Sequence, residues 1–509
     1  MKILIVHPGF SFNRQLNHFE AIIKLLGSIE KVECHIMACN KAYLACGFRG
    51  RLINYSIDSL LPSLWEKKCL DCQYKLIKRV RSFCSNVINV TDYIYNDINF
   101  FDKLVQQFPK NMLIKDFLSI NIKGVNVGAD IWQSIQYSLF MGTPETIIIP
   151  QKNSIGYEFL RSGLILFEGC YNLLKENHYD LLLLNEISYM DWGIPTKVAL
   201  SLNIPVIRQG NYYLGPQKLT LKRYNNLQEL SENHPLFPTQ SELGRIKRPE
   251  ELYKYADKGQ IEIVRWMCTG VSKKNDQELT NIIKQWIRPN RKTVVVFTHL
   301  CWDSSIAYGI RLYATFEEWL SATFEYAANT NTVDWIFRIH PSEKVTNTNQ
   351  KFNTMVHLNR LMQKFPCDHI KIMDSSVNLK TIELIPYIHV GISLIGTVFF
   401  ELPCFGIPCI VAATGSNVDI GFTINPSSID DYRNTLKNIA DLNRLPLSQQ
   451  KLAQAYVGLV FDENRFLNVG PAFNTDDSSD ERIDPIKLDN WITMPDSKTF
   501  IEKNFCNQF

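Results

Sequence analysis

This chain of 509 residues has a small net charge, few glycines and prolines, and few long hydrophobic runs. Lys plus Arg number 54 and Asp plus Glu 51, so no overall basic field argues for nucleic acid as a partner. Gly numbers 24 and Pro 22, which excludes collagen-like and low-complexity chains. The longest apolar stretch without a charge, residues 384–400, is at the short limit for a bilayer span. Its continuation through Glu401 and Pro403 is more typical of a buried strand, turn and helix.

Cysteine motifs and a signal sequence are lacking as well. The 13 cysteines are scattered, and the single CxxC, Cys69 to Cys72, has no second cysteine pair or histidine pair at zinc spacing. An odd, scattered set in a chain that is not secreted indicates buried reduced thiols. Only four consecutive apolar residues follow Lys2, too few for the apolar core of a signal peptide. We therefore expect a cytoplasmic protein with reduced thiols.

The chain has 45% hydrophobic and 12% aromatic residues, a composition typical of a packed globular protein. The length exceeds one ordinary hydrophobic core and predicts two large domains. In the first half, the pattern predicts strands at 3–6, 32–38, 181–184 and 205–208, and helices at 14–26, 159–177 and 195–202. Most of residues 40–150 show no clear pattern, apart from a basic helix around 75–84.

From Arg291 the alternation of strands and helices restarts as an independent unit. The pattern predicts strands at 293–298, 334–339, 370–373, 389–393 and 408–412, and helices at 310–328, 351–365, 377–385 and 397–405. This spacing indicates right-handed βαβ crossovers and a parallel sheet. We therefore expect an α/β chain with two Rossmann-like domains facing a cleft. The expected boundaries are 1–260 for an N-terminal domain, 261–290 for a linker, 291–445 for a C-terminal domain, and 446–509 for a C-terminal helix and tail.

Ligands of open α/β sheets bind beyond the carboxyl ends of the strands, so functional residues are expected in the loops there. The strand 334–339 ends in His340 and Pro341, and the proline fixes the backbone so that His340 stays at the rim of the sheet. A cationic or hydrogen-bond-donating imidazole at this place suits a nucleotide phosphate. The alternative is a rim histidine whose ring is satisfied by a neighbouring carbonyl.

A second strand-end loop runs from Ser393 through Gly396 to Thr397. A helix that begins at a Gly-Thr step presents backbone N–H groups and the positive end of its dipole to a phosphate. Glu401 lies four residues after Thr397, on the same helix face. A carboxylate in this apolar setting needs a partner, and a ribose diol is one. The alternative is a glutamate that only suits the helix dipole.

A third loop follows the strand 293–298 and contains Thr298 and Trp302. This loop could close over a nucleotide. For Trp302 itself we expect packing in the core or between domains, because a large aromatic side chain is more often buried than exposed to a ligand.

Taken in order, these residues resemble the donor-binding half of GT-B glycosyltransferases. More narrowly, they resemble the bacterial capsule and surface-polysaccharide group that includes Kdo transferases and polysialyltransferases. The matching pieces are Arg338-x-His-Pro-x-Glu343, Asp374-Ser375-Ser376, Ser393-x-x-Gly-Thr-x-x-x-Glu401 and Gly406-x-Pro408. The resemblance covers residues 291–415 and is only topological over the first half of the chain. One departure is Pro403, which would kink the helix that carries Glu401.

The resemblance implies that His340, Ser393 and Thr397 hold the phosphate of a nucleotide-activated sugar. The full donor-side set is Arg338, His340, Pro341, Glu343, Ser375, Ser393, Gly396, Thr397, Glu401 and Thr298. GT-B chemistry needs no metal if a helix dipole and a histidine absorb the charge of the leaving phosphate. We therefore expect neither a metal nor a cofactor.

The catalytic base, or the nucleophile of a retaining variant, is expected from the N-terminal domain. Glu186 and Asp191 share the loop after the strand 181–184, and the Asp-Trp-Gly sequence there remotely resembles a short acidic motif of polysialyltransferases. The alternatives are helix capping for Asp191 and an ion pair between Glu186 and a buried group such as Arg208. His7, after the first strand, is a third candidate, with simple turn chemistry as its alternative.

The sequence therefore predicts a glycosyltransferase that moves a sugar from a nucleotide-activated donor to a surface glycan or lipid-linked glycan. One alternative is a nucleotide-sugar 2-epimerase of the same fold, although such proteins have an Asp-Ser-Gly-Gly turn where this chain has Ser393-Leu-Ile-Gly-Thr. The other is a catalytically silent scaffold that binds a glycan or an assembly partner. The basic helix Lys75 to Arg81 is either a contact for an anionic acceptor or the inner membrane surface, or a solvated helix face. The donor, the acceptor, the anomeric outcome and the oligomeric state stay open.

Overall fold

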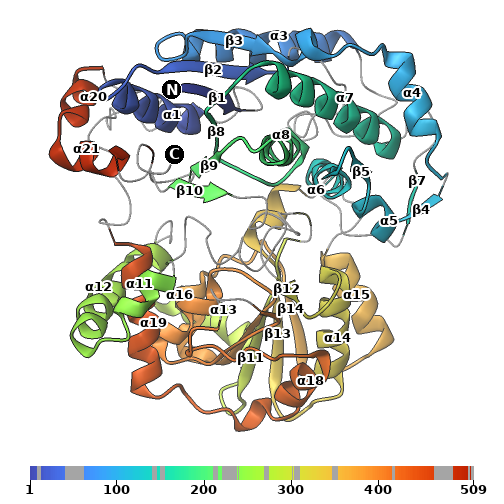
Figure 1. Cartoon of the computed structure of the whole chain (residues 1–509). Coiled ribbons are helices and arrows are strands. Elements are labelled where there is room, and N and C mark those ends of the chain that lie inside the picture. Colours follow the sequence, from blue (N-terminus) through green and yellow to red (C-terminus); the bar gives the residue numbers. More distant parts are fainter. Residues whose placement is uncertain are drawn as a thin grey trace. The chain divides into compact units, whose positions relative to one another are not determined.

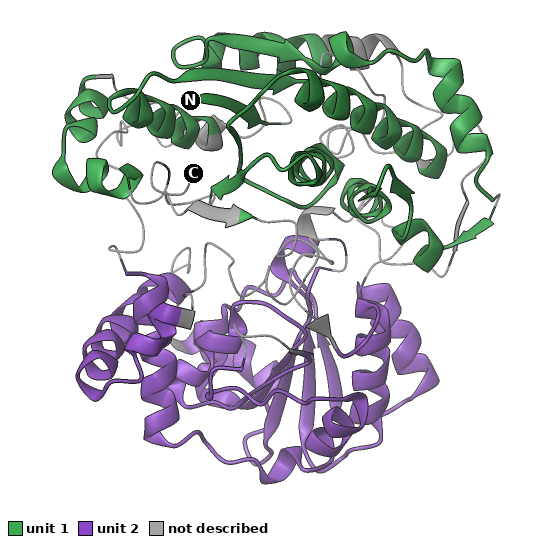
Figure 2. Cartoon of the chain, in the orientation of Figure 1, with its two compact units in different colours: residues 1–139, 144–226, 463–509 green, residues 140–143, 227–462 purple. Residues whose placement is uncertain are grey.

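The computed structural model describes residues 1–7, 13–39, 62–109, 111–139, 146–148, 155–209, 216–219, 238, 240–268, 274, 276–300, 302, 310–346, 354–414, 419–462, 485–502 and 505. The chain divides into two compact units (Figure 2). Unit 1 comprises Met1–Leu139, Pro144–Asn226 and Glu463–Phe509, and unit 2 comprises Phe140–Thr143 and Leu227–Asp462. Each unit has its own mainly parallel sheet, so the expected α/β class with two Rossmann-like sheets is confirmed (Figure 1).

The central element of unit 1 is a six-stranded sheet in the order β10-β9-β8-β1-β2-β3. Its strands are β1 (Lys2–Val6), β2 (Glu33–Ala38), β3 (Asn86–Asn89), β8 (Leu181–Leu184), β9 (Val206–Gln209) and β10 (Pro216–Leu219). The pairs run parallel except for β10, which is antiparallel to β9. The four strands expected in this half are confirmed, because central parallel strands are buried on both faces and form continuous apolar runs.

Helices and short strands complete unit 1. They are α1 (Asn13–Gly27), α3 (Pro62–Val80), η3 (Val90–Tyr93), α4 (Ile98–Gln106), β4 (Asn111–Leu113), α5 (Ile114–Leu118), β5 (Asn121–Ile122), β6 (Val125–Asn126), α6 (Gly128–Leu139), β7 (Thr146–Ile148), α7 (Ile155–Glu176), α8 (Met190–Ser201), α20 (Pro485–Ile492) and α21 (Pro495–Ile501). The helix expected at 195–202 in fact begins at Met190 and contains Pro195. This earlier start places the whole acidic loop after β8 next to, or inside, a helix.

The C-terminal segment belongs to unit 1. α20 and α21 pack against α1, and Leu488, Trp491 and Phe505 share one hydrophobic core with Phe19 and Ile22 of α1 (Figure 1). Residues 446–509 were expected to form one C-terminal helix and tail, and this prediction is wrong. The segment is divided, because its first helix is buried in unit 2 while its last two helices bury their apolar faces on α1.

Unit 2 contains a five-stranded sheet in the order β14-β13-β11-β15-β16, with all neighbours parallel. Its strands are β11 (Thr293–Phe297), β13 (Asp334–Arg338), β14 (Ile370–Met373), β15 (Ile388–Ser393) and β16 (Cys409–Val411). All five were expected from the sequence. Strand β11 at the centre is completely apolar after Thr293 and fully buried, as the middle strand of such a sheet requires.

The remaining elements of unit 2 surround this sheet. They are α11 (Gln240–Arg245), α12 (Pro249–Cys268), α13 (Asp276–Trp286), β12 (Ile310–Arg311), α14 (Phe316–Ala328), η4 (Pro341–Thr346), α15 (Thr354–Lys364), α16 (Thr381–Leu384), η5 (Ile385–Tyr387), α17 (Val398–Glu401), η6 (Pro403–Phe405), β17 (Ala413–Thr414), α18 (Ile429–Lys437), η7 (Ile439–Asp441) and α19 (Leu447–Val460). Three helices are shorter than expected. The helix predicted at 310–328 begins only at Phe316, because Thr315 caps it by accepting the N–H of Glu318, and residues 310 and 311 form the strand β12. The segment 377–385 forms only the single turn α16, and 397–405 is split into α17 and η6 because Pro403 cannot donate a helical hydrogen bond.

Residues 261–290 are not the expected linker. They contain the end of α12 and all of α13, and Ile263, Met267 and Ile283 lie in the core of unit 2. α12 also packs tightly on α19, since a Cβ at Gly259 would lie only 1.7 Å from the main-chain oxygen of Gln454. The charged residues of this region suggested a linker, but Arg265 and Lys284 stand on the exposed faces of packed helices, and the side chain of Lys274 is buried in an ion pair with Glu383.

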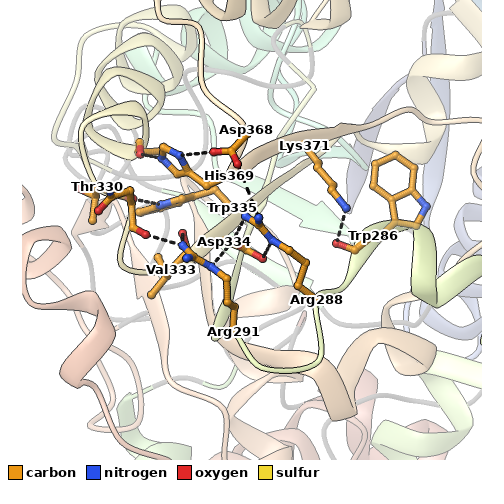
Figure 3. A network of polar contacts seen from close by, with 12 residues as sticks. Trp286, Arg288, Arg291, Thr330, Val333, Asp334, Trp335, Asp368, His369 and Lys371 are labelled. Atoms are coloured by element: carbon orange, nitrogen blue, oxygen red, sulfur yellow. Dashed lines mark hydrogen bonds and ion pairs between the residues drawn. The ribbon is translucent and has the colours of Figure 1, made fainter.

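A polar network fastens the amino ends of β13 and β14 (Figure 3). Asp334 accepts the Nε–H of Arg288 at 2.6 Å and lies 2.7 Å from Nε of Arg291. Burial raises the pKa of Asp334, but the two guanidinium groups outweigh it and hold the pKa below its ordinary value. His369 adds a bond to the main-chain oxygen of Ala327 at 2.9 Å. Because these residues stand where the strands begin, the network stabilises the edge opposite to the one where ligands bind in such sheets.

Candidate functional site

The carboxyl ends of three adjacent strands bring together three of the predicted donor-side residues in unit 2. Thr298 follows β11, His340 follows β13, and Ser393 ends β15, and the sheet places β11 between the other two. The hydroxyl of Thr298 donates to the main-chain oxygen of Arg338 and accepts the N–H of His340, both at 3.1 Å. Thr298 therefore fixes the backbone at the position of His340.

The imidazole of His340 is oriented by its own turn. Pro341 begins the short helix η4, and the backbone N–H of Ser342 donates to Nδ1 of His340 at 3.1 Å. In the neutral ring the proton is therefore on Nε2, so the ring can donate from that atom. The alternative was a histidine ring that is satisfied by a neighbouring carbonyl. Nδ1 is not bound in that way, because it accepts a hydrogen bond from an N–H group. The phosphate-binding role of His340 stays a prediction.

Arg338 is buried and directed toward α16. Its guanidinium donates to the hydroxyl of Thr381 at 2.7 Å and to the main-chain oxygen of Leu379 at 2.6 Å. Burial lowers the pKa of Arg338 to about 10, against the effect of the carboxylates of Glu401 and Glu383. These contacts hold the end of β13 against α16, and they give Arg338 a structural role whether or not it contacts a donor.

Glu343 is also held by protein groups. It is 4% exposed, and its Oε1 accepts the backbone N–H of Thr354, the first residue of α15, at 2.8 Å. Burial raises the pKa of Glu343, and the hydrogen bonds with Thr354 oppose the shift. The Glu343 carboxylate thus caps α15, a structural role that its place in the sequence motif did not reveal.

The loop after β15 has the glycine that its backbone requires. Gly396 adopts φ +136°, a conformation that side-chain-bearing residues rarely adopt. Ser393 is buried and donates its hydroxyl to the main-chain oxygen of Ile395 at 3.0 Å. The helix that follows Thr397 has a single α-helical turn, so it supplies a weaker dipole than the nine-residue helix expected at 397–405.

Glu401 is buried with partners from unit 2. Its Oε1 accepts the indole N–H of Trp266, on α12, at 3.4 Å, and Thr397 gives it a second side-chain hydrogen bond. Burial raises the pKa of Glu401, and these bonds together with the charge of Arg338 oppose the shift. The helix is interrupted at Pro403 as expected. The carboxylate of Glu401 ties α17 to α12, and its predicted contact with a ribose is untested.

Ser375, the remaining donor-side residue, lies half-buried in the turn after β14. Asp374 shapes this turn, since its Oδ1 accepts the N–H of Ser376 at 2.7 Å. β14 is the outermost strand on its side of the sheet.

Trp302, for which packing was expected, is buried, with 6% of its surface exposed.

A second set of polar residues lies at the carboxyl edge of the sheet in unit 1. β1 and β8 are neighbours, yet the chain continues from β1 to β2 on one side and from β8 to β9 on the other. The crevice outside such a reversal is where open α/β sheets bind ligands. His7 follows β1, is 2% exposed, and lies edge-on to the ring of Phe19 at 6.3 Å.

The two acidic candidates after β8 have different surroundings. Glu186 pairs with Arg208 at 3.4 Å, as the sequence suggested as an alternative, and its Oε1 accepts the N–H groups of Ile187 at 2.8 Å and Ser188 at 3.2 Å. Asp191 is 3% exposed and lies in the first turn of α8. The capping alternative for Asp191 is wrong, because the residue at the N-cap position is Tyr189.

Sequence reasoning missed three residues of this loop. Asn185 and Ser188 are each 1% exposed. Tyr189 has φ +70° and ψ 153°, an unusual conformation for a residue with a side chain, and its ring lies 4.6 Å from that of Tyr137. An Asn directly after an apolar strand was the only available signal, because neither burial nor backbone conformation can be read from the sequence.

Two further findings concern the described residues alone. Among them, no group of three or more His, Cys, Asp or Glu side chains is placed to hold a metal ion. None of the described helices combines the length and the apolar character that crossing a membrane would require.

Comparison with known proteins gives only distant structural likenesses, since no protein-family model and no curated protein matches the chain. A UDP-GlcNAc 2-epimerase from Neisseria meningitidis, bound to UDP-GlcNAc, shares 10% identity over 90% of this chain and 97% of its own, with TM-score 0.30. The β-Kdo 2,4 transferase KpsC from Thermosulfurimonas dismutans shares 12% identity over 55% of this chain and 79% of its own, with TM-score 0.34. Both kinds of enzyme considered from the sequence are thus present, but likenesses of this size carry no argument about activity.

Proposed function

We propose that this chain is a cytoplasmic glycosyltransferase that transfers a sugar from a nucleotide-activated donor, bound by unit 2, to a glycan acceptor. The observation that supports the proposal is the gathering of Thr298, His340 and Ser393 at one edge of a parallel sheet. These residues are far apart in sequence and lie at the carboxyl ends of three adjacent strands. Two of them belong to the motif that resembles the donor-binding half of GT-B glycosyltransferases.

Each of these residues has a definite part in the proposal. His340 donates its Nε2–H to a phosphate oxygen of the donor and stabilises the charge that develops on the leaving nucleotide. Thr298 positions His340 through the bond to its backbone N–H. The backbone turn at Gly396 and Thr397 lets a phosphate approach the main chain closely, because no side chain projects from Gly396.

The base that removes the proton from the acceptor hydroxyl is assigned to the loop after β8 in unit 1. Asp191 is the preferred residue, with Glu186 and His7 as the other candidates. A carboxylate is suited to this step because the attacking hydroxyl must lose its proton as the new bond forms.

The test is nucleotide binding by calorimetry and thermal shift with CMP, CDP, UDP and GDP, since a ligand stabilises the fold that binds it. We expect His340→Ala to weaken binding of the preferred nucleotide by about 1.5 to 3 kcal/mol, the range of a charge-assisted hydrogen bond. The matched control is His357→Ala, because His357 lies on α15 and its Nε2 is 2.9 Å from the hydroxyl of Ser321. Equal nucleotide affinity in wild type and His340→Ala would remove the phosphate role.

The two alternatives predict different outcomes with whole donors. Wild-type protein is incubated with UDP-GlcNAc, CMP-Kdo or CMP-N-acetylneuraminic acid, with and without glycan acceptors, and the products are identified by mass spectrometry and NMR. A glycosyltransferase forms a glycoside that depends on the acceptor. A 2-epimerase converts UDP-GlcNAc without an acceptor, and a silent scaffold releases no nucleotide from any donor.

A further inference from the structure

The loop after β8 contains buried polar atoms for which the described part of the chain provides no partner. Both side-chain atoms of Asn185, Nδ2 and Oδ1, are buried without a hydrogen bond, and so is Oγ of Ser188. The main-chain oxygen of Asn185 accepts the Nε–H of Arg208 at 3.4 Å. Buried polar groups are nearly always satisfied, so three such atoms within four residues require an explanation.

The backbone of the same loop is strained. Tyr189 is held at φ +70° and ψ 153° by contacts on either side. Its carbonyl oxygen accepts the N–H of Gly193 at 2.7 Å, and the next N–H, of Met190, donates to the hydroxyl of Ser134 at 2.8 Å. Strain of this kind persists where the surrounding structure enforces it, and it concentrates at binding and catalytic sites.

The position of the loop indicates which kind of ligand it serves. β8 lies beside β1 at the point where the order of the strands reverses, so Asn185 stands at the edge where open α/β sheets bind ligands. The three buried atoms of Asn185 and Ser188 carry no charge. The carboxylates of Glu186, in the loop, and of Asp191, in the first turn of α8, disfavour an anion. A carboxamide offers two donors and one acceptor, and a serine hydroxyl offers both functions. Sugar hydroxyls, which also donate and accept, match these groups.

We infer that Asn185 and Ser188 bind hydroxyl groups of the sugar to which transfer occurs, a role that rests on the proposed function. Since both residues are only 1% exposed, the group that contacts each of their side chains is small, a hydroxyl rather than a whole ring. The two residues are binding residues, and the proton transfer is left to Asp191.

The experiment tests whether the side-chain amide of Asn185 binds a ligand or only stabilises the fold. Asn185→Leu replaces the carboxamide by an apolar group of similar size, and Ser188→Ala removes the hydroxyl. The control is Asn172→Leu, because Nδ2 of Asn172 donates to the main-chain oxygen of Tyr93 at 2.9 Å. Three quantities are measured for each variant: the Tm without ligand, the affinity for the nucleotide preferred by wild type, and saturation-transfer NMR with the methyl glycosides of galactose, glucose and N-acetylglucosamine.

We expect Asn185→Leu to keep or raise the Tm, because removing an unsatisfied buried amide does not cost a protein hydrogen bond. The same variant and Ser188→Ala should weaken binding of the responding methyl glycoside at least tenfold while nucleotide affinity is unchanged. Asn172→Leu should lower the Tm and leave the glycoside signal unchanged.

Two outcomes overturn the inference. One is a fall in Tm for Asn185→Leu as large as that for Asn172→Leu. The other is that wild type binds no methyl glycoside, or that the variants bind it as well as wild type does. Buried water would then be the partner of these atoms. The proposed function fails separately: if no nucleotide binds while glycoside binding still depends on Asn185, the sugar site stands and the transferase assignment does not.

Discussion

Glu186 is held in its loop by contacts to one of its carboxylate oxygens. One oxygen of Glu186 faces the guanidinium of Arg208 and accepts two backbone N–H groups. These contacts make Glu186 a residue that shapes the loop, and Asp191 stays the proposed catalytic base.

Substituting each carboxylate by its amide separates these roles. Asp191→Asn should lower turnover by roughly a hundredfold or more with nucleotide affinity preserved. Glu186→Gln should lower the Tm, since it leaves the guanidinium of Arg208 buried without its counter-charge. Turnover is measured at saturating donor, and Tm by calorimetry. If both amide variants turn over normally, the base lies elsewhere, and His7 is the next residue to replace.

A buried ion pair near this loop makes stability depend on pH. Asp130 on α6 lies 2.7 Å from the ammonium of Lys197 on α8. Burial raises the pKa of Asp130 to about 6, although Lys197 opposes the shift. The folded protein therefore binds a proton at Asp130 more tightly than the unfolded chain does, whose value is near 3.8.

This residue should make the protein less stable as pH rises from about 4 to 6, and the loss should be complete above about 6. A shift of this size corresponds to roughly 3 kcal/mol. The measurement compares urea unfolding of wild type and Asp130→Asn from pH 4 to 7.5. The difference between their unfolding free energies should change across this window in the stated direction. A constant difference would show that Asp130 titrates alike in both states.

At the scale of elements, the contact between α12 and α19 depends on two glycines. The missing side chain of Gly259 leaves room for the main chain of Gln454, and that of Gly458 leaves room for the main-chain oxygen of Tyr255, 2.0 Å from an added Cβ. Main-chain atoms cannot move aside as a flexible side chain can. Close packing of the two helices is therefore possible only with these residues.

Gly259→Ala should destabilise the protein by about 1 to 3 kcal/mol or more, since the added methyl group must push the helices apart. The control is Gly244→Ala in α11, where an added Cβ meets no atom within 4 Å. That substitution should instead stabilise by roughly 0.5 to 1 kcal/mol, because alanine is the better helix former. Both values are obtained from urea unfolding. Equal effects of the two substitutions would contradict this helix contact.

The individual elements of unit 2 were largely predictable from the sequence, and their contacts were not. The five strands follow from apolar runs at regular spacing, a local signal. The length of α17 was overestimated, because a pattern of apolar residues continues through Pro403 although the hydrogen bonding does not. The capping of α15 by Glu343 and the contact of Glu401 with Trp266 join residues distant in sequence, so no local pattern contains them.

At the scale of the whole molecule, the proposed reaction should proceed without a divalent cation. In the proposal His340 and the backbone at Gly396 and Thr397 meet the charge of the leaving phosphate. We therefore expect turnover to be retained within about twofold after treatment with EDTA and desalting. The assay follows glycoside formation with the donor identified above, and a known metal-dependent transferase serves as the control. Loss of turnover that magnesium or manganese restores would require a metal site.

The distribution of the chain between the units is also a property of the whole molecule. The last helices return to unit 1 and place Trp491 and Phe505 in the core beside α1. The sequence predicts that such residues are buried, since large apolar side chains leave water. It does not predict against which element, because any apolar face of suitable shape satisfies the same requirement.

The amino-acid sequence alone determined the two sets of alternating strands and helices and the order of the polar residues that follow the strands. These features depend on periodicity and on neighbouring residues, so they are readable without coordinates. Only the tertiary structure decided that Thr298, His340 and Ser393 share one edge and that Glu186 pairs with Arg208. It also decided that the side-chain atoms of Asn185 are buried with no hydrogen-bond partner in the described part of the chain. Each depends on which strands become neighbours and on the burial that results, and these are set by the packing of the whole chain.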